Sequence, residues 1–383
     1  MVATVTDEQF AARELVRDWA RNSASGQGGT TAIRSMEQGD ADAWRPVFAG
    51  LAELGLFGVA VAEDSGGAGG SIEDLCAMVE EAARALVPGP VATTALASLV
   101  VDDRELLAAL AGGERFVGVA IEGSVRFDAA TARASGSVSW VLGAADGGVL
   151  LLPADGKWLL VDTASEGVQV EPLRATDFSR PLARVVLKSA PATLIGRSGR
   201  RVEDLAATVL AAEAAGVTRW SLETAVAYAK VREQFGQPIG SFQAIKHLCA
   251  EMLCRAEQAE VAAADAARAA GDSSDAEARQ FAIAAALAAS VGIAAAKANV
   301  KDCIQVLGGI GCTWEHDAHL YLRRAHSIGR FLGGAEHWLR RITALTQDGV
   351  RRRLGLDLSD QKEVQAMRPE IAAAVAEVAA QPE

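Results

Sequence analysis

The spacing of hydrophobic residues along the chain changes twice, and each change marks a different kind of structure. In residues 8–20 and 72–86 the apolar side chains recur three or four positions apart, which is the spacing of amphipathic helices. The glycine-rich residues 63–71 and the Pro-Gly-Pro sequence at 88–90 interrupt this pattern, because glycine and proline break helices. The pattern predicts a helical N-terminal domain over residues 1–112.

Residues 113–196 have a different pattern. Short runs of aliphatic and β-branched residues alternate with Gly, Asp and Pro, which is typical of strands joined by turns. The runs are FVGVAI, VSWVLG, VLLLPA, KWLLVD and LARVVLK. This part of the chain is predicted to form a compact middle β domain.

Helical periodicity returns after Gly196, in alanine-rich segments separated by glycine-containing breaks. The predicted helices cover residues 202–232, 243–270, 276–306 and 316–346. They indicate a C-terminal helical bundle of four helices over residues 197–383, with a short tail in which one further helix could follow Asp357. The order of helical domain, β domain and helical bundle places the chain in the α+β class.

The charge balance excludes some classes of partner. Lysine and arginine number 37 against 49 acidic residues, so the net charge is −12. This charge repels phosphate backbones and anionic lipid surfaces, and neither nucleic acid nor a membrane is therefore an expected partner. The N-terminus lacks the apolar core of a signal peptide, and no uninterrupted apolar run of about 18 residues is evident. A cytoplasmic protein is expected.

Cysteine and histidine residues give no sign of a metal centre. The five cysteines lack C-x-x-C spacing, which favours buried thiols in a reducing compartment over a disulfide framework or a zinc site. His316, Asp317 and His319 lie close together in the sequence, but a third strong ligand is missing. We expect no bound metal.

Two long motifs in the predicted bundle carry a family resemblance. VREQFGQPIGSFQAIKHLCAEM at 231–252 and QVLGGIGCTWEHDAHLYLRRA at 305–325 closely resemble signatures of the acyl-CoA dehydrogenases. Residues 51–86 also resemble the N-terminal helical domain of this family, and the resemblance weakens in 113–196. It implies the acyl-CoA dehydrogenase fold.

The resemblance also implies an activity and a cofactor. Family members desaturate acyl-CoA thioesters: a carboxylate removes the α-proton while hydride leaves the β-carbon for FAD. In the family's dimers the flavin ring lies on the β domain of one subunit, and the bundle of the neighbouring subunit holds the pyrophosphate and adenosine end. The resemblance therefore implies an FAD shared across a subunit interface.

Arg232 matches the family arginine that reaches the flavin pyrophosphate of the partner, a role that suits the planar guanidinium. By the same match, the other residues on the phosphate and adenosine side are Gln234, Phe235, Ile239, Phe242, Gln243, Ile245, Gln305 and Gly309. Taken without the motif, Arg232 is more simply interpreted as a surface arginine paired with Glu233 or Glu251, because such pairs are common; the motif reverses this preference.

The resemblance places no carboxylate where the family has its catalytic glutamate. The two alternative positions of that glutamate are occupied by Leu332 and Ala206, and an arginine common at the next position is replaced by Ala207. Glu203 and Glu336 lie about one helical turn from these positions and could supply a displaced base. For both, a solvent-facing acid is the simpler interpretation.

The residues that contact the flavin ring in the family are also largely missing. Only Trp140 and Asp146 resemble that part of the family pattern. These features predict a non-catalytic subunit resembling those of actinobacterial α2β2 acyl-CoA dehydrogenases, which act on steroid side-chain CoA thioesters. A catalytic partner subunit would then bind most of the acyl-CoA.

Two alternatives remain open. One is a self-sufficient homo-oligomeric dehydrogenase with a displaced base such as Glu203. The other is a structural relative that binds no flavin.

Overall fold

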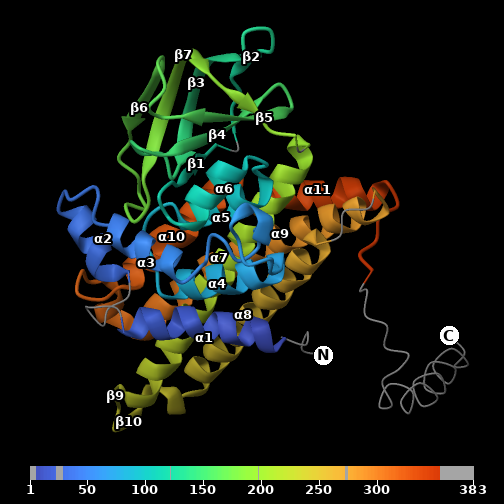
Figure 1. Ribbon diagram of the computed structural model, residues 1–383. Helices are drawn as coiled ribbons and strands as arrows, with labels where there is room; N and C mark the ends of the chain where they lie inside the picture. Colours follow the sequence, from blue (N-terminus) through green and yellow to red (C-terminus); the bar gives the residue numbers. More distant parts are fainter. Residues whose placement is uncertain (1–5, 23–28, 121, 197, 272–274, 354–383) are drawn as a thin grey trace, which may run out of the picture. The chain divides into compact units, whose positions relative to one another are not determined.

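The computed structural model describes residues 6–22, 29–120, 122–196, 198–271 and 275–353 (Figure 1). Contacts divide the chain into a large unit, Met1–Val350, and a second unit, Arg351–Glu383. All the helices and strands below lie in the large unit. The helix predicted after Asp357 lies outside the described residues.

The N-terminal part is helical, as predicted. Its elements are α1 (Asp7–Asn22), α2 (Thr30–Glu37), α3 (Arg45–Glu53), the short 3-10 helix η1 (Glu63–Ser65), α4 (Ile72–Arg84), α5 (Val91–Val100) and α6 (Arg104–Ala111). Helix α4 begins directly after the glycine-rich stretch, where Ser71 and Asp74 cap each other's backbone N–H groups. Every residue of α5 is buried, because this mostly apolar helix packs against both α7 and the sheet.

The middle part forms an eight-stranded sheet. Its strands are β1 (Val117–Val119), β2 (Arg126–Asp128), β3 (Arg133–Leu142), β4 (Val149–Ala154), β5 (Lys157–Asp162), β6 (Val168–Pro172), β7 (Leu182–Pro191) and β8 (Thr193–Leu194). The order is β6-β7-β3-β1-β4-β5-β8, with β2 pairing with β3. Only the pairing of β1 with β4 is parallel among the described strands. The register between β3 and β7 shifts between Val138 and Val141, which indicates a β-bulge.

The C-terminal part is a helical bundle. Its helices are α7 (Gly199–Val231), α8 (Gln243–Ala270), α9 (Asp275–Leu307), α10 (Ala318–Phe331) and α11 (Ala335–Gln347). A small hairpin of β9 (Glu233–Gln234) and β10 (Gln237–Pro238), followed by η2 (Ile239–Ser241), joins α7 to α8, and η3 (Gly308–Cys312) follows α9. Helix α7 also packs on α4, where a Cβ on Gly216 would lie 2.0 Å from the carbonyl oxygen of Glu80. Only glycine allows this close approach.

The prediction of a single fourth helix over 316–346 was wrong. The chain forms α10 and α11 instead, separated by Gly333 and Gly334, whose φ angles are +73° and +82°. These angles favour glycine and end a right-handed helix. The Trp338 indole donates a hydrogen bond to the Leu332 carbonyl at 2.8 Å, which holds α11 against the end of α10.

Helix α9 is unusually apolar for its length. Residues 277–312 are long and apolar enough to cross a membrane by length and composition, but 72% of the most apolar window is buried inside the molecule. The apolar residues of α9 face α7 and α8, so α9 serves as the central helix of the bundle. Its apolar run is interrupted by Ser290 and Gly292 and ends at Lys297, so it contains no uninterrupted apolar stretch of about 18 residues.

Candidate functional site

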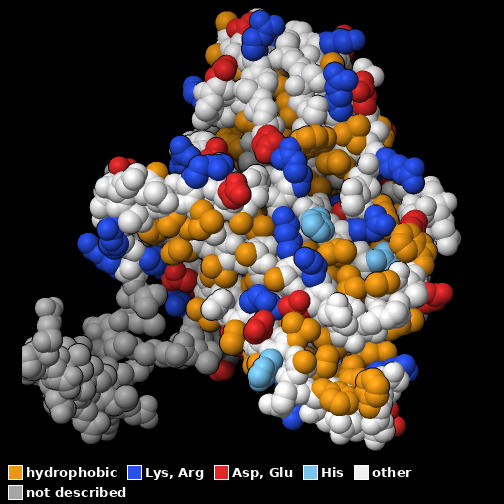
Figure 2. Space-filling view, turned by 180° about the vertical axis from the view of Figure 1, so that it is seen from behind, with side chains coloured by type: hydrophobic (Ala, Val, Ile, Leu, Met, Phe, Trp, Pro, Cys, Tyr) orange, Lys and Arg blue, Asp and Glu red, His pale blue; other side chains and the backbone are white. Residues whose placement is uncertain are grey.

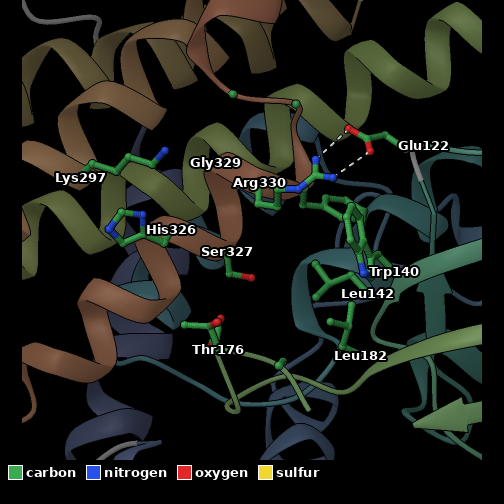
Figure 3. A pocket seen from close by; sticks show the side chains of 15 residues that line it. Glu122, Trp140, Leu142, Thr176, Leu182, Lys297, His326, Ser327, Gly329 and Arg330 are labelled. Atoms are coloured by element: carbon green, nitrogen blue, oxygen red, sulfur yellow. Dashed lines mark hydrogen bonds and ion pairs between the residues drawn. The ribbon is translucent and has the colours of Figure 1, made fainter. Parts of the chain in front are cut away.

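A cavity of about 690 Å³ lies where the sheet meets α9 and α10 (Figure 3). Its labelled lining side chains are Glu122, Trp140, Leu142, Thr176, Leu182, Lys297, His326, Ser327 and Arg330, with Gly329 on the same wall. One side is apolar, formed by Trp140, Leu142 and Leu182 from the sheet. Lys297 and His326 lie together on the opposite side. The volume is in the range of small-molecule sites.

The cavity has a cationic side. Burial and the nearby charges of Lys297 and Lys301 lower the pKa of His326, because a protonated imidazole there would be poorly hydrated and repelled. His326 is therefore neutral at pH 7, and Lys297 carries the charge on this side.

Both carboxylates that line the cavity are committed to arginines. Glu122 forms an ion pair with Arg330 at 3.1 Å. Asp177 accepts from both Arg180 and Arg324 at 3.1 Å. Burial alone would raise the pKa of Asp177, but the charges of Arg324 and Arg180 outweigh it and hold this pKa below its ordinary value. A carboxylate stabilised in this way is a weak base.

Asp177 belongs to a buried charge network that joins the sheet to the bundle. The Glu213 carboxylate on α7 accepts from Arg180 at 2.9 Å and from Arg324 on α10 at 2.8 Å. Arg180 also donates to the Ser327 hydroxyl at 2.7 Å, directly beside the cavity. These charged side chains are almost completely buried, and their pairing keeps one wall of the cavity in place.

The positions that match the family's base are buried in apolar surroundings. Ala206 lies in the core of α7, and Leu332 ends α10 with 2% of its surface exposed. Glu203 is paired with Arg200 at 3.3 Å, and Glu336 is 90% exposed on α11. Neither glutamate lines the cavity.

The predicted cofactor-binding residues lie at the far end of the bundle, on and beside the β9–β10 hairpin. Phe235 and Gly236 form its two-residue turn, with φ angles of +54° and +81°. Positive φ at both central positions is typical of a type I′ turn, in which phenylalanine is strained. The turn holds the Phe235 side chain 94% exposed. Figure 2, seen from behind, shows hydrophobic side chains gathered at this end of the bundle.

Arg232 ends α7 and is exposed. Its backbone is fixed by two hydrogen bonds, from its own N–H to Tyr228 and from Ile239 to its carbonyl. No described residue forms an ion pair with its guanidinium, and Glu251 instead lies 4.0 Å from Arg255. The interpretation of Arg232 as a paired surface arginine is therefore not supported.

The first turn of α8 lies directly after the hairpin. Phe242 precedes this helix and gives it no side-chain cap; the Ile245 N–H donates to the Phe242 carbonyl at 3.1 Å, and no side chain caps the first turn. A free guanidinium and an uncapped helix N-terminus are both suited to a phosphate group. The phosphate end of FAD fits this arrangement.

The other predicted residues divide into two groups. Gln234, Gln243, Gln305 and Gly309 are exposed at this end of the bundle, where a Cβ on Gly309 would meet nothing within 4 Å. Ile239 and Ile245 instead pack against the apolar cluster of α8 and α9 that supports the hairpin. Phe242 lies between the two groups and contacts Phe235 edge to face, with ring centroids 6.1 Å apart.

The histidine cluster after η3 has other roles. His316 accepts from the backbone of Ala318, Asp317 pairs with Arg34, and His319 stacks on Trp314 at 4.2 Å. Among the residues that the structure describes, no group of three or more potential ligands is placed to hold a metal ion.

The fold and these motifs agree with sequence comparison. The acyl-CoA dehydrogenase N-terminal domain matches residues 6–104, and the acyl-CoA dehydrogenase C-terminal domain matches residues 204–346. Acyl-CoA dehydrogenase IpdE2 of Mycolicibacterium smegmatis is 33% identical over 89% of this chain and 99% of its own length.

The chain belongs to the acyl-CoA dehydrogenase family. It is 76% identical to acyl-CoA dehydrogenase FadE34 of Mycobacterium tuberculosis over its whole length, but it spans only 54% of that relative. The resemblance read from the motifs is thus confirmed, together with the α+β fold class.

Solved structures agree with this assignment. A variant of the Tcur3481-Tcur3483 steroid ACAD superposes with a TM-score of 0.80 at 27% identity, covering 90% of this chain and 99% of that one. The ChsE4-ChsE5 complex from Mycobacterium tuberculosis shares the fold, with a TM-score of 0.78 at 24% identity over 92% of this chain and all of that one. The fold also matches an acyl-CoA dehydrogenase complexed with FAD from Bacillus anthracis, with a TM-score of 0.76 at 20% identity over 91% of this chain and 69% of that one.

Sequence reasoning missed several side chains of the cavity. Lys297 lies on α9, and His326 and Arg330 lie on α10. Glu122 lies much earlier in the chain, in the loop after β1. The basic residues of α10 were visible in the sequence, but no periodicity shows which of them faces the sheet. Only the packing of α10 against the sheet brings Arg330 to Glu122.

Proposed function

We propose that this chain is a non-catalytic subunit of a flavin-dependent acyl-CoA dehydrogenase of mixed subunits. Its bundle end holds the pyrophosphate and adenosine end of an FAD whose ring lies in a catalytic partner of the same family. The partner supplies the base and most of the acyl-CoA site. The assembly removes hydrogen from Cα and Cβ of an acyl-CoA thioester.

One observation carries this proposal: a cation at the hairpin is unpaired among the described residues, whereas the carboxylates that line the cavity are already paired. At the hairpin, Arg232 is exposed and its guanidinium lacks an ion-pair partner among the described residues, and no side chain caps the first turn of α8, which follows the hairpin through η2. At the cavity, both lining carboxylates are bound by arginines. The hairpin end is ready to bind a phosphate group, whereas the cavity lacks a carboxylate that is free to take a proton.

The position of Glu203 argues against a self-sufficient enzyme. Its carboxylate lies 3.3 Å from Arg200 and 4.0 Å from Arg341, away from the cavity. A base must come within hydrogen-bond reach of the α-carbon's proton, and a side chain outside the cavity does not.

The comparisons support a partner of the same family. Two structural neighbours are described by pairs of chain names, and one of these is called a steroid ACAD. The 76% identical relative has nearly half its length outside the match, which is enough for a second unit of similar size. A steroid side-chain CoA thioester is the proposed substrate class.

The test is to co-express the chain with each neighbouring gene product of the same family and to measure flavin in the purified complex. Replacing Arg232 with Ala should weaken FAD binding roughly 10- to 100-fold, because hydrogen bonds to charged groups contribute about 1.5–3 kcal/mol. Arg232→Lys should retain part of the affinity, since it keeps the charge but loses the planar fork.

Arg126→Ala is the matched control, because Arg126 is also exposed and lies on β2, in the sheet. Unchanged flavin occupancy in Arg232→Ala would rule out the shared-cofactor role. A colourless complex with the wild-type chain would instead favour a flavin-free structural relative.

A further inference from the structure

The widest aromatic surface of the cavity wall is the indole of Trp140. This residue lies within the β-bulge of β3, where the register against β7 shifts between Val138 and Val141. Its φ angle is +64°, in the left-handed region that non-glycine residues rarely adopt. The bulge turns the side chain out of the sheet toward α10, so that it remains 49% exposed.

One face of this indole is already covered. The Arg330 guanidinium lies 4.2 Å from the centre of the Trp140 ring, which is the stacking distance of a cation–π pair. A flat aromatic ligand that stacks on Trp140 would require the space that this planar guanidinium occupies. A flavin ring therefore cannot stack on this face of Trp140 while Arg330 keeps this position.

Two further interactions hold the Arg330 guanidinium in this position. Its guanidinium donates to both carboxylate oxygens of Glu122, at 3.1 and 3.3 Å (Figure 3). Arg330 also belongs to the last turn of α10, where the helix dipole favours a positive charge. The arginine thus bridges the loop after β1, the strand β3 and the end of α10.

We propose that Arg330, held by Glu122, closes the face of Trp140 and so excludes a flavin ring from this chain's own cavity. This chain then contacts only an FAD whose ring lies in the partner, because Arg330 blocks a ring in its own cavity. This cause adds to the missing base. The part of this inference that concerns the assembly rests on the proposed function. The closure itself concerns this chain alone.

The contacts that close the site are individually weak. Arg330 and Glu122 are 55% and 52% exposed, and exposed ion pairs and cation–π contacts each contribute little. Replacing Arg330 removes both the ion pair and the cation–π contact. The affinity of the cavity for a flavin ring should then rise about ten-fold. This small difference in affinity is sufficient to keep a flavin ring out of the cavity if the chain makes few other contacts with the ring.

The experiment measures riboflavin binding to the full-length chain without a partner. Riboflavin carries the ring but no phosphate, so its binding does not depend on Arg232. Stacking on Trp140 quenches flavin fluorescence, and titration gives an affinity for the wild type, Arg330→Ala and Glu122→Gln. We expect Arg330→Ala to bind about ten-fold more tightly than the wild type and Glu122→Gln to lie between them.

Arg340→Ala is the matched control, because Arg340 is an exposed arginine on α11 that lies 3.9 Å from Glu336. It should bind riboflavin like the wild type. Adding Trp140→Leu to Arg330→Ala should abolish the gain, which shows that the ligand stacks on the exposed indole. Circular dichroism of each variant checks that the chain remains folded.

Equal binding by the wild type and Arg330→Ala, whether tight or undetectable, would overturn the closure. Weaker binding by Arg330→Ala would also overturn it, because Arg330 would then be a ligand of the ring. The proposed function fails by a different result, unchanged flavin content in the complex with Arg232→Ala, so the two failures are distinguishable.

Discussion

Two arginines of this chain show how strongly surroundings decide what one residue type does. Arg232 is exposed at the end of α7, and no described residue forms an ion pair with it. Arg330 is bound by Glu122 and stacked on Trp140. A free guanidinium can bind a phosphate, whereas one already satisfied by a carboxylate and an indole acts as a barrier.

Asp204 illustrates the same point for a carboxylate. Its side chain is 4% exposed and lies 2.5 Å from Arg341 of α11. Burial raises the pKa of Asp204 to about 6, although the charge of Arg341 opposes the shift. The folded chain therefore binds this proton more tightly than the unfolded chain, whose carboxyl has an ordinary pKa.

The consequence is a defined pH dependence of stability. Between about pH 4 and pH 6 the folded state holds a proton that the unfolded state has lost, so the free energy of unfolding should fall as the pH rises. The contribution is at most about 3 kcal/mol. Urea unfolding of the wild type and Asp204→Asn at several pH values checks it.

In that comparison the variant should gain stability relative to the wild type as the pH rises through this window, with a constant difference above about pH 7. Parallel stability curves for the two proteins from pH 4 to pH 7 would show that Asp204 does not titrate in this way.

At the scale of elements, α10 is the helix that connects the sheet to the bundle. Arg324 enters the buried network with Asp177 and Glu213, and Arg330 covers Trp140 about 1.7 turns later. Helix α10 therefore carries both a member of the buried network and the arginine that covers Trp140. Its end is determined by Gly333 and Gly334, which separate it from α11.

The buried network should be sensitive to loss of a single charge. In Glu213→Gln the guanidinium groups of Arg180 and Arg324 would remain buried with only Asp177 as a charged partner. Breaking a buried pair in this way costs about 3–5 kcal/mol. Denaturant unfolding should show a loss of this size.

Arg184→Gln is the control for this measurement, because its ion pair with Glu171 at 3.7 Å is exposed. The control should change stability by less than about 1 kcal/mol. A similarly small loss in Glu213→Gln would mean that the network relaxes or admits water.

At the scale of the whole molecule, the proposal predicts a stoichiometry. The chain purified without a partner should be colourless, and the complex should contain one flavin for every two units, since Arg330 covers Trp140 in the cavity of this chain. Absorbance at the flavin band, compared with the protein concentration, measures this ratio. A yellow homo-oligomer that oxidises an acyl-CoA with an artificial acceptor would contradict the non-catalytic role.

Much of the fold was accessible from the sequence. The order of helices, strands and helices follows from hydrophobic spacing, because each spacing suits only one regular structure. The family followed from two motifs in the bundle. The division at Gly333 was missed, since helical periodicity continues on both sides of two residues with positive φ.

The fold class, the family and the candidate FAD-binding residues at 232–245 were predictable from the sequence, because these predictions depend on local pattern and contiguous motifs. The tertiary structure alone decided which charged groups are paired. Glu122 and Arg330 are separated by 208 positions and meet only when α10 packs beside the sheet. Side-chain pairing depends on distances in space, and for this reason the closure of Trp140 became visible only in the folded chain.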